Sequence, residues 1–200
     1  MSTKTNTIIG AIVAIAIIIS VAVLIYVNLP KQAHTTPEDK TPTETNPTIF
    51  TLVYSGEQKN FSMAELERLE PYTGKGGYRK QTGTISGWGN YTGVNITTLI
   101  DLFDPAPLQY SLKVFTGDEK NMSYNFTTIL GNVYIYNPDN ASEPIGKGNM
   151  TMVLAYKYEG NWLDESDDGN LRIVFLDHQG FVTQSSLWQK KIISISIITE

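Results

Sequence analysis

Few residues of this 200-residue chain have side chains suited to catalysis. It has no cysteine, so it lacks every thiolate nucleophile and every thiolate metal ligand. Of its two histidines, only His178 lies in the part expected to fold, where it follows Asp177 in a polar loop. A lone histidine makes no zinc site, and no nucleophile-elbow motif accompanies the serines. We therefore assign no catalytic residue and no metal ligand.

Two short motifs begin like known binding loops but do not complete them. The acidic run at 164–169 starts like an EF-hand calcium loop, but the position of its last carboxylate is Phe175. We interpret this run as a solvated hairpin turn. The glycine-rich run at 74–77 lacks the Lys-Ser/Thr ending of a phosphate loop, so a turn is the simpler interpretation. Gly76 and Gly77 would still let a ligand approach the backbone, because they carry no side chain.

Polar loops that contain aromatic residues are the best candidates for a ligand site. An aromatic ring with a polar edge suits a small planar ligand, although core packing is the alternative for each ring. The candidate ligand-binding residues are Gly76, Gly77, Arg79, Trp88, Tyr91, His178, Trp188 and Lys190.

Mostly strands must position these residues. Runs rich in Val, Ile, Thr, Tyr and Phe predict strands at 49–54, 78–86, 110–116, 122–126, 133–136, 150–158, 171–176 and 192–198. In the last run Ile193, Ile195 and Ile197 alternate with serines, which predicts that these three isoleucines face the core.

Two short helices are predicted between the strands. Ser62 and Glu65 have the spacing of a capping box, which predicts a helix over 63–69. The same spacing recurs later and predicts a second helix over 97–103. Because helices and strands do not alternate regularly, the pattern indicates an α+β domain that is mostly β.

The region before residue 49 differs in composition from the rest. Residues 8–28 are almost wholly apolar and uncharged. About 20 such residues span a hydrocarbon core of about 30 Å, which predicts a transmembrane signal-anchor after a short cytoplasmic segment, 1–7. A cleaved signal peptide is the alternative, but its apolar region is shorter, about 7–15 residues. Residues 29–48 are rich in Pro and Thr and predict a disordered tether to a domain at 49–200.

Seven Asn-x-Ser/Thr triplets orient the predicted anchor in the lipid bilayer. Chance predicts roughly two in a sequence of this composition. Because N-glycosylation happens outside the cytoplasm, they predict a single-pass cell-membrane protein with an extracytoplasmic C-terminal domain. An Asn- and Thr-rich surface without sugar is the alternative. The candidate glycosylation sites are Asn60, Asn90, Asn95, Asn121, Asn125, Asn140 and Asn149.

Several short segments in chain order carry a family resemblance. They are Tyr91-Thr92-Gly93-Val94, Leu154-Ala155-Tyr156 with Gly160 and Leu163, Leu171-Arg172-Ile173-Val174, and Trp188-Gln189-Lys190. Over about residues 50–198, this order resembles the molybdopterin-binding domain of the sulfite oxidase-like oxidoreductases, particularly its short stand-alone prokaryotic members. The resemblance implies the fold of that domain. It is also the only reason to consider molybdopterin as a cofactor, and the residues themselves leave the cofactor unknown.

The same resemblance implies a cysteine ligand to molybdenum, and this chain has no cysteine. Fold similarity alone transfers no function. We therefore expect a membrane-anchored, non-catalytic extracytoplasmic domain that binds an unknown small molecule or a cell-surface protein. A divergent molybdopterin-dependent oxidoreductase, or its redox accessory, is one alternative, and a structural cell-surface glycoprotein is another. The net charge of -5, without a basic cluster, argues against a nucleic-acid partner.

Overall fold

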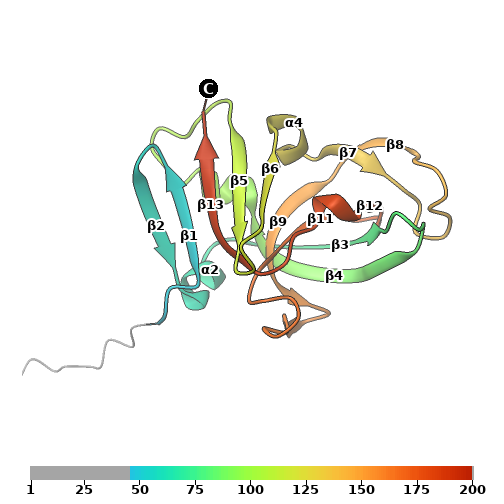
Figure 1. Cartoon of the computed structure of the whole chain (residues 1–200), viewed down its shortest axis with the longest axis horizontal. Coiled ribbons are helices and arrows are strands. Elements are labelled where there is room, and N and C mark those ends of the chain that lie inside the picture. Colours follow the sequence, from blue (N-terminus) through green and yellow to red (C-terminus); the bar gives the residue numbers. More distant parts are fainter. Residues whose placement is uncertain (1–45, 200) are drawn as a thin grey trace, which may run out of the picture. The chain divides into compact units, whose positions relative to one another are not determined.

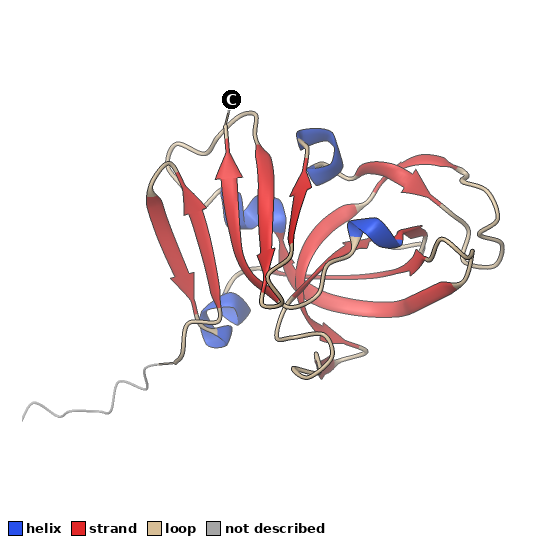
Figure 2. Ribbon diagram, in the orientation of Figure 1, coloured by secondary structure: helices blue, strands red, loops and turns tan. Residues whose placement is uncertain are grey.

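The computed structural model of the protein describes residues 46–199. The predicted anchor at 8–28 and most of the predicted tether lie outside these residues. No helix among the described residues is long and apolar enough to cross a membrane. The described part is mostly β with a few short helices, which agrees with the predicted fold class (Figure 2).

A five-stranded sheet joins the two ends of the described domain (Figure 1, left). Its strands, in spatial order, are β2 (Glu57–Phe61), β1 (Phe50–Tyr54), β13 (Ile192–Ile198), β5 (Ser111–Thr116) and β6 (Asn121–Tyr124). β1 and β13 pair in parallel, with Leu52 opposite Ile195, and the other pairs are antiparallel. Val114 of β5 lies on the other side of Ile195, so these buried side chains form one row of the core.

A larger sheet curves beside the first (Figure 1, right). Its strands, in spatial order, are β10 (Asn161–Trp162), β9 (Thr151–Tyr158), β4 (Ile85–Asn95), β3 (Pro71–Arg79) and β12 (Val182–Gln184), and β11 (Arg172–Leu176) also pairs with β9. β7 (Asn132–Ile135) and β8 (Gly146–Asn149) form a separate pair. The strand predicted over 78–86 was wrong, because Lys80 N donates to Thr84 O at 2.8 Å and closes a turn between β3 and β4.

Short helices and turns connect the strands. The predicted capping box is confirmed at α2 (Met63–Arg68), where Ser62 N donates to the Glu65 carboxylate at 2.7 Å. The second helix, α3 (Ile96–Ile100), starts and ends earlier than predicted, because Asn95 rather than a threonine caps it. A third helix, α4 (Phe126–Ile129), and a 3-10 turn, η1 (Ser185–Leu187), were not predicted.

One prediction about the core was wrong. Ile193 is 49% exposed, whereas Ile192 is buried. The pairing register between β13 and β5 shifts between Ile192 and Ser194, and such an irregularity turns side chains to the opposite face. Ile195 and Ile197, which follow the shift, face the core as predicted. The irregularity lies directly after the segment that carries the candidate site.

Candidate functional site

The segment at 188–191 connects η1 to β13 and pairs with the start of β11, where Ile173 N donates to Gln189 O at 2.8 Å. Its backbone is held on both sides. Lys191 N donates to Asp168 O at 2.7 Å, and Gly117 N donates to Lys191 O at 2.8 Å. The segment is therefore fixed between the turn before β11 and the turn after β5, which sets the positions of the side chains of Trp188, Lys190 and Lys191.

Arg172 lies at the centre of the site, beneath this segment. Its side chain is buried, and its Nη1 lies 3.1 Å from Asp168 Oδ1. The guanidinium carbon is 6.0, 5.5 and 5.3 Å from the ring centroids of Tyr78, Tyr91 and Trp188. Aromatic faces attract a cation at such distances. Arg172 Nε has no hydrogen-bond partner among the described residues. The guanidinium is therefore stabilised mainly by the three aromatic rings and by the Asp168 carboxylate.

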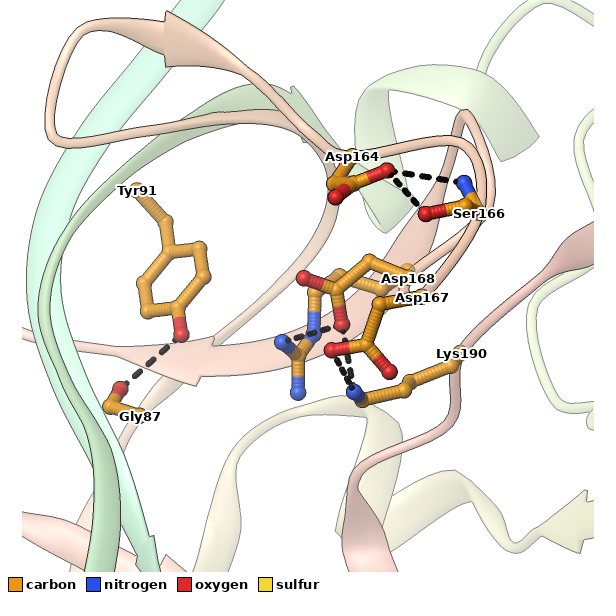
Figure 3. A network of polar contacts seen from close by, with 8 residues as sticks. Gly87, Tyr91, Asp164, Ser166, Asp167, Asp168 and Lys190 are labelled. Atoms are coloured by element: carbon orange, nitrogen blue, oxygen red, sulfur yellow. Dashed lines mark hydrogen bonds and ion pairs between the residues drawn. The ribbon is translucent and has the colours of Figure 1, made fainter.

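Lys190 extends the buried pair toward the surface (Figure 3). Its Nζ lies 2.8 Å from Asp168 Oδ1 and 3.0 Å from Asp167 Oδ2. Partial burial alone would lower the pKa of Lys190, but the hydrogen bonds to Asp168 and Asp167 raise it above its ordinary value. Lys190 therefore stays protonated, and Asp168 faces two cations. The interpretation of 164–169 as a solvated turn was wrong at Asp168, whose side chain is only 18% exposed.

A cavity of about 310 Å³ opens beside this network, and we call it the Lys191 cavity. It is lined by Thr116, Asp118, Lys120, Asp167, Trp188, Gln189, Lys190 and Lys191. Hydrogen bonds from Lys120 and Thr116 lower the pKa of Asp118 to about 2. Asp118 is therefore charged at neutral pH and balances Lys120, whose Nζ lies 2.7 Å from its carboxylate.

Lys191 has an unusual backbone and no balancing charge. Its φ of 57° lies in the left-handed region, which residues other than glycine seldom adopt. A Cβ at Gly169 would lie 2.6 Å from Lys191 Cα, so the turn before β11 needs a glycine there. Lys191 forms no ion pair with any residue of the described range. It is thus the one lysine of the cavity lining without a carboxylate partner.

Three of the residues predicted to bind a ligand meet at this site. Tyr91 and Trp188 lie against Arg172, and Lys190 forms an ion pair with Asp168, the carboxylate partner of Arg172. Tyr91 Oη donates to Gly87 O at 2.9 Å, and burial raises the pKa of this phenol. The hydroxyl therefore remains a neutral donor at neutral pH, and Figure 3 draws its hydrogen bond to Gly87.

Each of the two predicted glycines packs closely against a residue of another strand. A Cβ at Gly76 would clash with the carbonyl oxygen of Phe175 on β11. A Cβ at Gly77 would lie 2.8 Å from the Cα of Trp88 on β4. The close approach that these glycines permit is therefore between strands of the same sheet.

Trp88 belongs to a separate cluster at the surface. It is 42% exposed, and its Nε1 donates to Gly180 O at 2.8 Å. Lys75 Nζ lies 3.5 Å from the centroid of its ring, a cation–π contact. The chain's own lysine thus covers one face of this indole.

His178 and Arg79 lie apart from the other predicted residues. His178 borders a pocket of about 290 Å³ together with Asp177 and Asn149. Arg79 Nε donates to the carbonyl of Ala141, and its guanidinium lies 5.3 Å from the Tyr136 ring centroid. Arg79 therefore attaches the loop before β8 to β3.

Three residues that organise the site were not among the predicted site residues. They are Arg172, Asp168 and Lys191. One signal could have revealed the first of them. Arg172 is the single charged residue in the predicted strand at 171–176, and all five residues of β11 are buried. An arginine is rarely buried without a partner, so this position called for a nearby carboxylate.

The side chains do not fit a molybdenum centre of the kind that the family resemblance implies. That centre needs a thiolate, and the chain has no cysteine. The described residues also contain no group of three or more His, Asp or Glu side chains placed to hold a metal ion. We therefore derive no chemistry through molybdenum.

Comparison with known proteins adds evidence on the fold. No family model and no curated protein matches this chain. Among solved structures, the sulfane dehydrogenase SoxCD from Paracoccus pantotrophus has a TM-score of 0.50 and 14% sequence identity. The match covers 76% of this chain and 38% of that chain, so this chain corresponds to well under half of its neighbour's length. At this identity the likeness shows the fold alone, and the described domain is similar in fold to one part of SoxCD.

Proposed function

We propose that this chain is a membrane-anchored extracytoplasmic protein whose folded domain binds a small oxyanion in the Lys191 cavity without catalysing a reaction. The apolar run at 8–28 supports the anchor, and the seven Asn-x-Ser/Thr triplets support the side of the membrane. The charges of the cavity lining and the backbone of Lys191 support the anion site.

The proposed anion site depends on one feature, a lysine with a left-handed backbone and no ion pair among the described residues, Lys191. A left-handed conformation costs a residue other than glycine about 1–2 kcal/mol, and such strain concentrates at functional sites. The other two lysines of the lining, Lys120 and Lys190, pair with carboxylates. Lys191 therefore adds to the cavity lining one positive charge that no carboxylate of the described residues pairs with.

The rest of the lining favours a small anion over a bare cation or a large cofactor. The Gln189 amide provides a neutral group that can donate a hydrogen bond to oxygen, whereas the Thr116 hydroxyl already donates to Asp118. The cavity of about 310 Å³ is at the lower end of ligand pockets, about 300–1,000 Å³. Sulfite, thiosulfate and phosphate are small oxyanions that differ in shape and charge, so these three are the first anions to test.

The titratable groups at this cavity suit binding better than proton transfer. A general base works best when its pKa lies near the ambient pH. The pKa of Asp118 is about 2, and that of Lys190 is raised, so neither changes its charge near neutral pH. The lining also contains no histidine. These groups hold charge in place, as a binding site requires.

Thermal unfolding of the full chain in detergent micelles tests this proposal. A ligand that binds only the folded state stabilises it by about 2.7 kcal/mol at a concentration of 100 Kd. We expect one of the three anions to raise the Tm of the wild type and of Lys80→Gln, which removes an exposed charge elsewhere. The same anion should raise the Tm of Lys191→Gln clearly less. An equal rise in all three proteins would show that the anion acts outside the cavity.

A further inference from the structure

The side chain of Asn125 leaves one of its polar atoms free. Asn125 caps α4, and its Oδ1 accepts hydrogen bonds from Thr128 N and Thr127 Oγ1, both at 2.9 Å. Its Nδ2 takes part in no hydrogen bond of the described residues. The residue is exposed and begins an Asn-x-Thr triplet. The cap thus uses the oxygen, while the nitrogen that receives sugar in N-glycosylation stays accessible.

Two pockets meet at this residue. One, of about 290 Å³, includes Gln109, Tyr110 and Phe126, and the other, of about 210 Å³, includes Asn132 and Tyr134. Asn125 and Thr127 belong to both linings. A group attached to Asn125 would therefore lie next to both pockets.

The second pocket has the chemistry of a sugar-binding surface. Tyr134 is 51% exposed, and Lys147 Nζ lies 5.6 Å from its ring centroid, so the apolar face away from Lys147 is the one that a ligand can contact. Asn132 and Gln184 line the same pocket with amides, which can both donate to and accept from hydroxyl groups. Lys147 is its single charged lining residue. This mixture suits a neutral ligand rich in hydroxyl groups better than it suits an ion.

We infer that Asn125 carries an N-linked glycan whose first sugars lie in the pocket against Tyr134. This inference rests on the proposed extracytoplasmic location. In the modification, Nδ2 forms a bond to the anomeric carbon of a sugar and loses one proton. The bond from that carbon to the phosphate of a lipid-linked oligosaccharide donor breaks, and the lipid phosphate leaves. The Oδ1 atom keeps its hydrogen bonds, so α4 stays capped after modification.

Asn140 provides a matched control. Its Oδ1 accepts a hydrogen bond from Ser142 Oγ at 2.8 Å, which repeats the local geometry at Asn125. Asn140 is also exposed. Asn125→Asp and Asn140→Asp each keep an acceptor oxygen and remove the nitrogen that sugar requires. Both variants should therefore fold. They differ because Asn125 lines the pocket that contains Tyr134 and Asn140 does not.

The test uses full-length protein purified from the membranes of its own host. Peptide mass spectrometry shows which of the seven asparagines carry sugar. The rate of nitration of Tyr134 by tetranitromethane then reports whether its ring is covered. We expect sugar on Asn125, several-fold slower nitration of Tyr134 in the wild type than in Asn125→Asp, and a rate in Asn140→Asp equal to that of the wild type.

The outcomes separate this inference from the proposed location. Sugar on none of the seven asparagines would contradict the evidence for the location and the inference together. Sugar on other asparagines but not on Asn125 would overturn the inference alone. Sugar on Asn125 with equal nitration of Tyr134 in the wild type and Asn125→Asp would show that the glycan does not lie in the pocket.

Discussion

Asp168 Oδ1 lies 3.1 Å from Nη1 of Arg172, and the same oxygen lies 2.8 Å from Nζ of Lys190. One carboxylate thus joins a buried guanidinium to a lysine that lines the Lys191 cavity. The link connects the core of the larger sheet to the proposed site. It makes the stability of the domain and the shape of the cavity depend on the same side chain.

Asp168→Asn should destabilise the domain strongly. Removing one partner of a buried ion pair costs about 3–5 kcal/mol, because the remaining charge is left without compensation. The control Asp164→Asn removes an exposed carboxylate of the same turn and should cost less than about 1 kcal/mol. Denaturant unfolding of the full chain, followed by tryptophan fluorescence, measures both. Similar losses in the two variants would show that Arg172 does not depend on Asp168.

Gly76→Ala should lower the free energy of unfolding, because the added Cβ would meet the carbonyl oxygen of Phe175. The expected loss is about 1–3 kcal/mol, as for other overpacked positions. Gly117→Ala is the matched control, since its Cβ would meet no atom closer than 3.7 Å. The same denaturant titration checks this pair. A Gly76→Ala protein as stable as Gly117→Ala would remove the packing explanation for this glycine.

Glu65→Gln should destabilise the protein at neutral pH and much less in acid. The backbone hydrogen bond from Ser62, and then its hydroxyl, lower the pKa of Glu65 from its ordinary 4.5. A carboxyl with a lowered folded-state pKa contributes stability above the unfolded-state pKa. That contribution is lost as the pH falls through the folded-state value. The difference in unfolding midpoint between wild type and variant should therefore shrink below about pH 4.5. Glu70→Gln, outside the capping box, serves as the control.

Lys191→Gly should raise stability while it weakens anion binding. Glycine adopts a φ of 57° without the steric cost that lysine bears, so we expect a gain of about 0.5–1 kcal/mol. The thermal shift with the bound anion should be clearly smaller in this variant. A variant that is less stable than the wild type would show that the lysine side chain, rather than function, maintains this backbone.

The predicted topology can be tested with a single engineered thiol, because the chain has no cysteine. Leu108 is 94% exposed, so Leu108→Cys should react readily without disturbing the core. We expect a membrane-impermeant maleimide to label this variant on intact cells. Labelling that appears only after permeabilisation would place the domain in the cytoplasm.

Local sequence patterns predicted most strands and the first helix, because these depend on residues close in the chain. Ser62 and Glu65 specify a cap by themselves, and their helix was predicted within one residue of its end. The β3–β4 hairpin was harder to predict. Its glycines are typical of loops, but at Gly76 the residue that requires a glycine is Phe175, about 100 residues away in the sequence.

The site was less predictable than the fold for a similar reason. Trp188 and Tyr91 were chosen for their aromatic rings, but the cation that brings them together is Arg172 on β11, far from both in the sequence or on another strand. The charge balance of the cavity depends partly on Lys190, which pairs with Asp167 and Asp168, 23 and 22 residues away in the sequence. The left-handed backbone of Lys191 depends on contacts with Gly169 and Gly117, which no local pattern specifies.

Isothermal titration of the full chain with the anion that raises its Tm tests the central claim most directly. Hydrogen bonds to charged groups contribute about 1.5–3 kcal/mol, and each 1.4 kcal/mol changes affinity tenfold. We therefore predict saturable binding at one site, about tenfold or more weaker in Lys191→Gln and unchanged in Lys80→Gln. No binding by the wild type, or equal affinities in all three proteins, would contradict an anion site at the Lys191 cavity.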